Sequence, residues 1–341
     1  MYKCFILFLL CGAASLSARL NVVATNGIVA DWAEQVGGKE VSVTTFAGPG
    51  MDPHHFEPSP RQLGALAKAD VVIGFGEGLE PWLGDAMQAS GSQAELLVLT
   101  DHAELMEFGA AFWQDMPLLY PKAESKPPCC KEDAIKANEV WGKMRKLMPT
   151  GHQHDAHDHG HDHGEYDPHV WLDPQQALMM VLAINLTFAE LDPAHADYFD
   201  ERRQAYLDQL IELDEWAEAR LGEVAANRRI LIGYHDNLRY FGRRYGFFTP
   251  ASILGSVSTE APDPSAKQFH ELLKLIEQFS PPALFIDASA NPRLAQQIQR
   301  EAGVPTVATL YTDNITAADG PAPDYLTLMR VNVETITDSL R

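Results

Sequence analysis

Short apolar segments alternate with stretches of helical spacing over the first hundred residues. Leu20–Thr25 is a continuous apolar, β-branched run typical of a buried strand, and Glu40–Phe46 alternates like a second strand. Gly27–Val36 between them has helical spacing and ends at Gly37 and Gly38. The pattern continues with a helix and two more strands: Ser59–Lys68, Val71–Ile73 and Leu96–Leu99. This alternation predicts a parallel sheet covered by helices.

The pattern breaks down between about residues 107 and 165, which we interpret as a long surface insertion. Gln175–Leu191 is then apolar on most sides and predicts a buried helix, and Pro193–Val224 predicts another long helical stretch. Strands and helices alternate again afterwards: Arg229–Gly233, Asn237–Tyr245, Ser265–Phe279, Ala283–Asp287, Pro292–Ala302, Thr306–Thr309 and Pro323–Leu340.

The length of the chain also favours two units. Single hydrophobic cores stop growing at about 250–300 residues, and this chain has 341. The expected fold is α/β, with two lobes joined by one long helix. The predicted division is a signal peptide at 1–18, an N-terminal lobe at 19–174 that includes the insertion, a linking helix at 175–194 and a C-terminal lobe at 195–341.

The first eighteen residues have the features of a secretory signal. Lys3 precedes an apolar segment from Cys4 to Cys11, and small residues end at Ala18. The apolar segment is too short to span a bilayer. Leu10 stands before Cys11, where a lipoprotein needs a small residue. We therefore expect cleavage near Ala18 and a soluble protein in the periplasm.

Cleavage would leave only two cysteines, the adjacent Cys129 and Cys130. They are compatible with a strained vicinal disulfide, with thiolate metal binding or with a pair of exposed thiols. A disulfide framework cannot hold this fold together.

Acidic residues dominate the composition. There are 47 of them against 26 basic residues, which gives a formal net charge of −21. Such a surface repels nucleic acid and anionic lipid and attracts cations. We expect no nucleic-acid partner.

The segment Gly151–Pro174 is unusually rich in histidine. Six imidazoles fall within twelve residues, with aspartates between them: His152, His154, His157, His159, His161 and His163. Neutral imidazoles donate lone pairs to Zn²⁺, and a packed core does not use this kind of alternation. The tract predicts an auxiliary metal-binding loop, the alternative being a merely solvated segment.

Four further residues have the context of a metal site. Three of them follow predicted strands and one precedes the long helix: His54, His235, Asp313 and His169. Ligands of open α/β sheets bind at the carboxyl ends of strands. Three imidazoles and one carboxylate suit Zn²⁺ and suit Mn²⁺ less well. A helix cap or a buried structural residue is the alternative for each. We expect surface or structural roles for the others without this context: His102, His195 and His270.

Several longer motifs resemble those of one known family, the zinc/manganese-type (cluster A-I) solute-binding proteins of ABC importers, and most closely its zinc-specific periplasmic members. The motifs span nearly the whole mature chain: GMDPHHFEPSPRQLGALAKADVVIGFGEGLEPWL (50–83), HDHGEYDPHVWLDP (161–174), GYHDNLRYFGRRYG (233–246), APDPSAKQ (261–268) and LYTDNI (310–315). The Cys-Cys segment departs from the family pattern.

The resemblance implies two lobes, each a mostly parallel four-stranded sheet flanked by helices, joined by one long rigid linking helix. It also implies a metal in the cleft between the lobes. His54 and His169 match the first and second ligands of the family. His235 matches the third, where manganese-binding members tend to have Glu, and Asp313 matches the fourth, which some zinc-specific relatives lack.

Two acidic residues lie inside the ligand motifs without matching a ligand. We expect Glu57 and Asp173 to orient backbone or imidazole N–H groups, and Trp82 and Trp171 to pack in the core.

The resulting hypothesis is a monomeric periplasmic receptor that carries Zn(II) as cargo to an inner-membrane ABC permease, with a periplasmic metal chaperone as a further candidate partner. A manganese receptor of the same family, or a zinc chaperone or adhesin without an importer, stays open. A zinc hydrolase is the enzymatic alternative. It is disfavoured because four protein ligands close the site, and because the chain has neither a His-Glu-x-x-His helix nor a nucleophile elbow.

Overall fold

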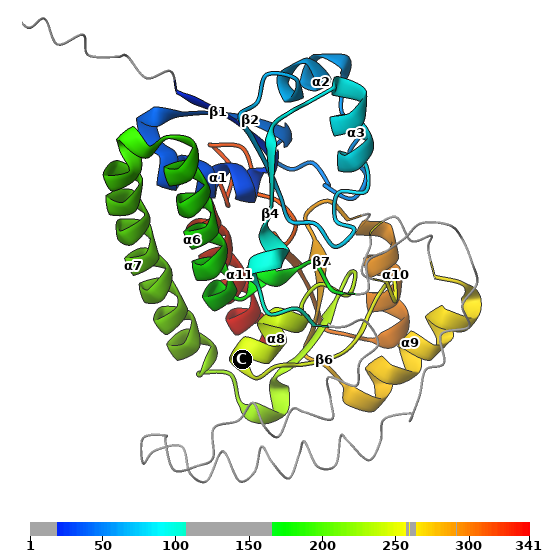
Figure 1. Ribbon diagram of the computed structural model, residues 1–341. Helices are drawn as coiled ribbons and strands as arrows, with labels where there is room; N and C mark the ends of the chain where they lie inside the picture. Colours follow the sequence, from blue (N-terminus) through cyan, green and yellow to red (C-terminus); the bar gives the residue numbers. More distant parts are fainter. Residues whose placement is uncertain (1–18, 107–165, 257–258, 260–263, 291) are drawn as a thin grey trace, which may run out of the picture.

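The computed structural model of the chain describes residues 19–106, 166–256, 259, 264–290 and 292–341 (Figure 1). The predicted signal peptide lies outside the described residues. The cysteine pair and the six histidines of the predicted auxiliary loop do so too: Cys129, Cys130, His152, His154, His157, His159, His161 and His163.

Four parallel strands form the sheet of the N-terminal lobe, in the order β2-β1-β3-β4. Their bounds confirm the strands expected there: β1 Leu20–Asn26, β2 Val41–Ala47, β3 Val71–Gly74 and β4 Glu95–Val98. Three helices accompany them: α1 Gly27–Gly37, α2 Pro60–Leu66 and α3 Leu83–Ser90. Asn26 starts α1 because its side chain accepts a hydrogen bond from Val29 N. The pattern of apolar residues did not predict α3.

Two long helices follow, α6 Pro174–Leu191 and α7 Ala196–Leu221 (Figure 1). The predicted linking helix corresponds to α6, which has 18 residues, whereas α7 has 26. α7 packs on α1 of the N-terminal lobe and on α11 at the end of the chain. No single helix among the described residues is long and apolar enough to cross a membrane. Together α6 and α7 reach that length and composition, but they are bent by 119° where they meet.

The C-terminal lobe contains two parallel strand pairs, β5–β6 and β7–β8. Its elements are β5 Ile230–Gly233, α8 Arg239–Tyr245, β6 Phe248–Ser252, α9 Ala266–Phe279, β7 Ala283–Asp287, α10 Pro292–Ala302, β8 Thr306–Leu310 and α11 Tyr325–Leu340. β5 lies beside β7, but the expected four-stranded sheet is divided there into two hydrogen-bonded pairs. β6 was not predicted, because its sequence FTPAS contains a proline and has no apolar alternation.

Short 3₁₀ turns connect several of these elements: Gly38–Glu40, Leu99–His102, Val170–Leu172, Pro193–His195 and Ala226–Arg228.

One hydrophobic core extends from the first sheet through α6 and α7 to α11. At its centre Trp32 of α1 meets Tyr325 of α11 with ring centroids 5.1 Å apart, and Phe75 meets Trp171 at 4.3 Å. Trp171 also donates from Nε1 to Thr312 O at 2.6 Å. The expectation that Trp171 packs in the core is confirmed, since it is fully buried. Because both lobes contribute to this core, large lobe rotations would break it.

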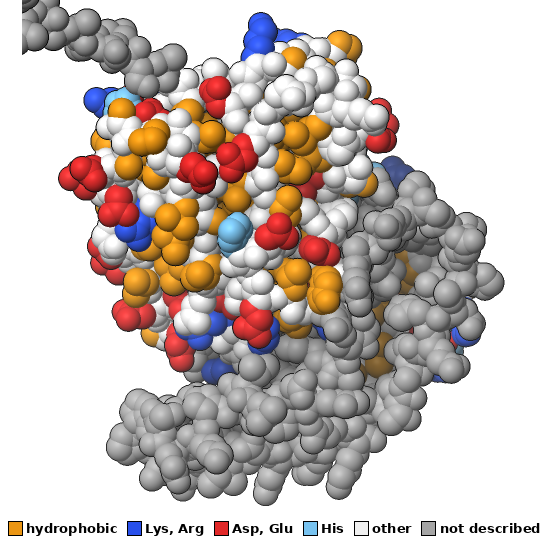
Figure 2. All heavy atoms as spheres, viewed as in Figure 1, with side chains coloured by type: hydrophobic (Ala, Val, Ile, Leu, Met, Phe, Trp, Pro, Cys, Tyr) orange, Lys and Arg blue, Asp and Glu red, His pale blue; other side chains and the backbone are white. Residues whose placement is uncertain are grey.

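Acidic side chains are spread over the face seen in Figure 2, with apolar groups between them. This agrees with the net charge of −21. Such a surface attracts cations over a range limited by salt screening.

Candidate metal centre

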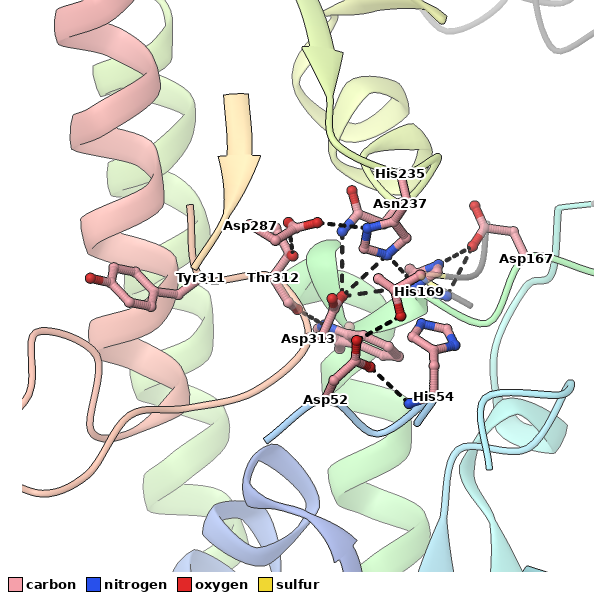
Figure 3. Close-up of polar contacts among 12 residues, drawn as sticks. Asp52, His54, Asp167, His169, His235, Asn237, Asp287, Tyr311, Thr312 and Asp313 are labelled. Atoms are coloured by element: carbon pink, nitrogen blue, oxygen red, sulfur yellow. Dashed lines mark hydrogen bonds and ion pairs between the residues drawn. The ribbon is translucent and has the colours of Figure 1, made fainter. Parts of the chain in front are cut away.

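Four side chains that are distant in sequence meet where the two lobes face each other (Figure 3): His54, His169, His235 and Asp313. His54 lies in the loop after β2, His235 follows β5 and Asp313 follows β8 by a few residues. His169 precedes the turn Val170–Leu172 that leads into α6. One ligand atom from each of the four lies within 4.8 Å of all the others, and all four residues are at most 5% exposed.

Three separations between ligand atoms lie near those of a four-coordinate metal. His169 Nε2 and His235 Nε2 are 3.2 Å apart. Asp313 Oδ1 lies 3.5 Å from His235 Nε2 and 3.9 Å from His169 Nε2. A tetrahedral zinc ion with bonds of about 2.0–2.1 Å needs neighbouring ligand atoms about 3.3 Å apart. Separations of up to 4.8 Å within the set would have to shorten for all four atoms to bind one zinc ion.

Carboxylates hold the outer nitrogens of two of the imidazoles. His169 Nδ1 lies 2.8 Å from Asp167 Oδ1, and His235 Nδ1 lies 2.6 Å from Asp287 Oδ2. Asp287 is held in turn by Thr312, whose hydroxyl donates to it at 2.5 Å. With Nδ1–H donating outward, each ring directs Nε2 to the centre, where a deprotonated Nε2 can bind a metal as in metal-bound histidines.

Two buried atoms of the cluster have no hydrogen-bond partner among the described residues: His54 Nε2 and Asp313 Oδ2. Buried polar atoms are nearly always satisfied, so an exception needs an explanation. A cation bound at the centre would give His54 Nε2 a partner and could bind the Asp313 carboxylate through one of its two oxygens. The donor set, three nitrogens and one oxygen, also suits a divalent metal.

The titratable groups of the metal-free centre have pKa values shifted in different directions. Burial, reinforced by His169, lowers the pKa of His54 well below its usual value. Burial also acts to lower the pKa of His235, but the carboxylates of Asp313 and Asp287 outweigh it and raise that pKa well above the usual value. Burial opposes ionisation of Asp313, yet His235 and His169 keep its pKa low. Without metal, a protonated His235 thus pairs with ionised Asp313, and a metal must displace that proton.

The same local motif, Asp-Pro-His, presents two of the histidines. Asp52 Oδ1 accepts from His54 N at 2.9 Å, and Asp167 Oδ1 accepts from His169 N at 3.0 Å. Tyr240 of α8 secures the second motif by donating to Asp167 O at 2.8 Å. The repeated motif was visible in the sequence, but the roles of its aspartates were not predicted.

Two other polar groups near the centre were also missed. Asn237 Nδ2 donates to Asp313 Oδ1 at 3.3 Å. Asp287 is the last residue of β7, at the carboxyl end of a strand, and this position was the one available signal.

The expectation for Glu57 is wrong. Its side chain is exposed, and the carboxylate that holds the His54 backbone belongs to Asp52. The reason is that Asp52 is two residues before His54, a spacing that lets its side chain turn back onto the backbone. Asp173 is buried and caps α6 by accepting from Gln175 N at 3.0 Å, which agrees with a capping role. Burial raises the pKa of Asp173 to about 6.

The remaining histidines of the described chain lie apart from the centre. His55, His102 and His270 are exposed. His195 forms a hydrogen bond with Asp192 at 2.7 Å, and this contact raises the pKa of the imidazole.

Known proteins resemble the chain over nearly its whole length. The model of the ZnuA family, described as "Zinc-uptake complex component A periplasmic", matches residues 22–339. The chain is 24% identical over 324 residues to the iron ABC transporter substrate-binding lipoprotein MtsA of Streptococcus pyogenes serotype M1, covering 95% of this chain and 90% of that protein. It is 23% identical over 326 residues to the manganese ABC transporter substrate-binding lipoprotein PsaA of Streptococcus pneumoniae, covering 96% and 90%.

Solved structures share the fold. The periplasmic zinc-binding protein TroA of Treponema pallidum superposes with a TM-score of 0.72 at 24% identity, covering 95% of this chain and 99% of that one. A cadmium-bound periplasmic metal-binding protein of Candidatus Liberibacter asiaticus gives a TM-score of 0.71 at 17% identity, covering 95% and 100%. With the family match over nearly its whole length, the chain belongs to the ZnuA family and is a metal-binding, substrate-binding protein of an ABC importer, not an enzyme.

Proposed function

We propose that the protein is a periplasmic zinc receptor that takes up Zn²⁺ between its lobes and delivers it to an ABC permease in the inner membrane. The observation that carries the proposal is the buried cluster of three imidazoles and one carboxylate: His54, His169, His235 and Asp313. The division into an N-terminal lobe at 19–174, a linking helix at 175–194 and a C-terminal lobe at 195–341 belongs to the same proposal.

The donor set favours zinc over manganese. Zinc accepts four-coordinate sites rich in imidazole, whereas manganese prefers oxygen ligands and higher coordination numbers. Relatives do not decide the matter, because MtsA is named for iron, PsaA for manganese and TroA for zinc. A manganese receptor is therefore the second candidate, because PsaA of the same family is named for manganese.

Metal capture follows from the placement of the ligands. Ligands come from both lobes, and the lobes share one core, which supports a small lobe tilt in place of a wide hinge closure. Histidines of the segment 152–163 would bind zinc weakly and raise its concentration near the centre. Release would require the permease, or a periplasmic metal chaperone, to separate the ligands. We propose that the receptor acts as a monomer.

Residues 1–18 would direct export, with cleavage near Ala18 and release into the periplasm. MtsA and PsaA are lipoproteins by name. For this chain Leu10 before Cys11 argues against lipid attachment. A zinc chaperone or adhesin that serves no importer is the remaining alternative, and a neighbouring permease and ATPase in the same operon would argue against it.

Competitive titration of Zn²⁺ against Mn²⁺ tests the proposal. It should be done on the chain without residues 1–18 and on a variant that also lacks residues 152–163. We expect one tight zinc site and weak manganese binding in both proteins. Loss of all tight zinc binding after the deletion would place the site in the histidine tract and refute the four-ligand centre. Manganese binding tighter than zinc binding would support the second candidate.

A further inference from the structure

The side chain of Asn314 makes hydrogen bonds across the interface between the lobes. Its Oδ1 accepts from Gly27 N, at the start of α1, at 2.9 Å. Its Nδ2 lies 3.1 Å from Ala47 O and 2.9 Å from both Gly48 O and Met51 O. One buried carboxamide of the C-terminal lobe thus uses both its acceptor and its donors on the backbone of the N-terminal lobe.

These contacts connect two parts of the metal centre. Asn314 directly follows Asp313, and the three carbonyls belong to the turn that leads into Asp52 and His54. Gly50 N, in the same turn, also donates to Ile315 O at 2.8 Å. The turn that presents His54 is therefore fastened to the segment that presents Asp313.

The packing around this contact leaves little freedom. A Cβ atom on Gly27 would lie 2.4 Å from the Ile315 side chain and 2.5 Å from Asn314 Oδ1, so the start of α1 lies directly against this segment. Aspartate at position 314 could still accept from Gly27 N with one oxygen, but its other oxygen, in place of Nδ2, would face the three carbonyls and be repelled by them. The side chains of alanine and serine are too short to reach both Gly27 N and the three carbonyls. The contacts specifically fit asparagine.

We propose that Asn314 is the positioning residue that keeps His54 in register with Asp313, and that it thereby determines how long zinc is retained and how strongly zinc is preferred over manganese. The proposal rests on the proposed function of the same centre. Asn314 does not touch the metal but acts through the ligands on either side. Zinc needs its four ligand atoms at fixed separations, whereas manganese can replace a displaced imidazole by water. Freeing the His54 turn should therefore weaken zinc binding more than manganese binding.

The test uses the chain without residues 1–18 and its Asn314→Ala variant. Removing a group that orients metal ligands typically lowers metal affinity roughly 10–100-fold. We expect zinc affinity to fall in that range, mainly through faster dissociation into excess chelator, and the preference for zinc over manganese to decrease. The visible spectrum of bound Co²⁺, which reports coordination geometry, should change as well. A change in stability alone would not produce these last two results.

Asn332→Ala is the matched control. Asn332 is also buried, and its carboxamide bonds to Tyr311 N and O at 2.9 and 2.7 Å, but both contacts lie within the C-terminal lobe. It should lower stability without altering the zinc–manganese preference or the Co²⁺ spectrum. If it alters them as Asn314→Ala does, the contact between lobes is not the cause and the inference is overturned.

Two further outcomes separate this inference from the proposed function. If the wild-type chain itself lacks tight zinc binding, the proposed function fails. If the wild type binds zinc tightly while Asn314→Ala keeps its dissociation rate and Co²⁺ spectrum, only this inference fails. Should Asn314→Ala not fold, Asn314→Ser serves for the same measurements, because its short side chain also cannot connect Gly27 N with the turn carbonyls.

Discussion

The segments Asp52-Pro53-His54 and Asp167-Pro168-His169 share a sequence and a local hydrogen bond, but their carboxylates have different second partners. Asp167 Oδ1 lies 2.8 Å from Nδ1 of its own histidine. Asp52 Oδ2 instead accepts from the hydroxyl of Thr259, in the C-terminal lobe, at 2.6 Å. One carboxylate orients an imidazole, and the other connects a loop to the opposite lobe.

This difference indicates how each ligand is held. His169 is oriented by its own motif and is fully buried. His54 depends on contacts made by its loop, and its Nε2 has no hydrogen-bond partner among the described residues. We therefore expect His54 to be the ligand that leaves first when metal is released, because a small shift of its loop is enough to displace the ring.

Replacing the two histidines by alanine should have the largest effects. His169→Ala should reduce zinc affinity more than His54→Ala, because it also leaves the buried Asp167 carboxylate without the ring that it contacts. Both losses should exceed the roughly 10–100-fold typical of groups that only orient ligands. Equilibrium competition with a chelator of known affinity measures them. Tight zinc binding that survives either substitution would contradict the assignment of that ligand.

The two aspartates provide the next comparison. Asp167→Asn should lower zinc affinity by roughly 10–100-fold, because an amide oxygen holds the His169 ring less strongly than a carboxylate does. Asp52→Asn should change equilibrium affinity less and mainly speed zinc dissociation. Stopped-flow release into excess chelator separates the two cases. Equal effects on affinity and on dissociation in both variants would mean that the two motifs are equivalent.

The residues that could form the metal centre were easier to predict from the sequence than the residues that orient them. His54, His235 and Asp313 were predictable as neighbours because each follows a predicted strand, and ligands of α/β sheets bind at the carboxyl ends of the strands. The role of Asp287 was not predictable. It depends on β7 lying beside β5, which is a contact between segments that are distant in sequence.

The helices and strands also include some that the sequence predicted and some that it did not. Strands such as Leu20–Asn26 were predictable from their continuous apolar pattern. β6 and α3 were not, because tertiary packing stabilises Phe248–Ser252 and Leu83–Ser90 without a strong pattern of their own. Glu57 was misassigned because distance along the chain does not reveal whether a side chain is buried.

His235 resembles His169 in that a carboxylate holds its Nδ1. The effect of carboxylates on the pKa of His235 gives a prediction about pH. Its pKa is raised well above the usual value in the metal-free fold, while that of His54 is lowered, so zinc should displace about one proton at pH 6–7. Zinc affinity should then rise about tenfold per pH unit until the pH passes the pKa of His235. Calorimetric titration in buffers with different ionisation heats counts the protons released. If zinc binding releases no proton, the pairing of His235 with Asp313 is contradicted.

The same shift affects stability without metal, with the opposite sign. A raised histidine pKa stabilises the fold below the unfolded value of about 6.5, and this contribution disappears as pH rises through the folded pKa. The free energy of unfolding of the metal-free protein should fall over that range. Asp287→Asn, which removes one of the charges that raise the pKa of His235, should reduce both the proton release and this pH dependence.

Thr259→Val should have the smallest effect and tests the Asp52 contact alone. The substitution keeps the shape of the side chain and removes the hydroxyl that donates to Asp52. Zinc dissociation should become faster by about tenfold or less, which corresponds to about 1.4 kcal/mol. A hydrogen bond to a charged group contributes about 1.5–3 kcal/mol, but only part of this should be lost from the dissociation barrier, because the Asn314 contacts still hold the loop. Unchanged dissociation would show that Thr259 does not help to hold the His54 loop.

The most direct test of the central claim is a crystal structure of the chain without residues 1–18, loaded with one equivalent of zinc and measured at the zinc absorption edge. The account predicts one strong anomalous peak about 2.0–2.1 Å from an imidazole nitrogen of each of His54, His169 and His235, with a carboxylate oxygen of Asp313 as the fourth ligand. A peak bound by histidines of residues 152–163, with no zinc among these four side chains, would contradict it.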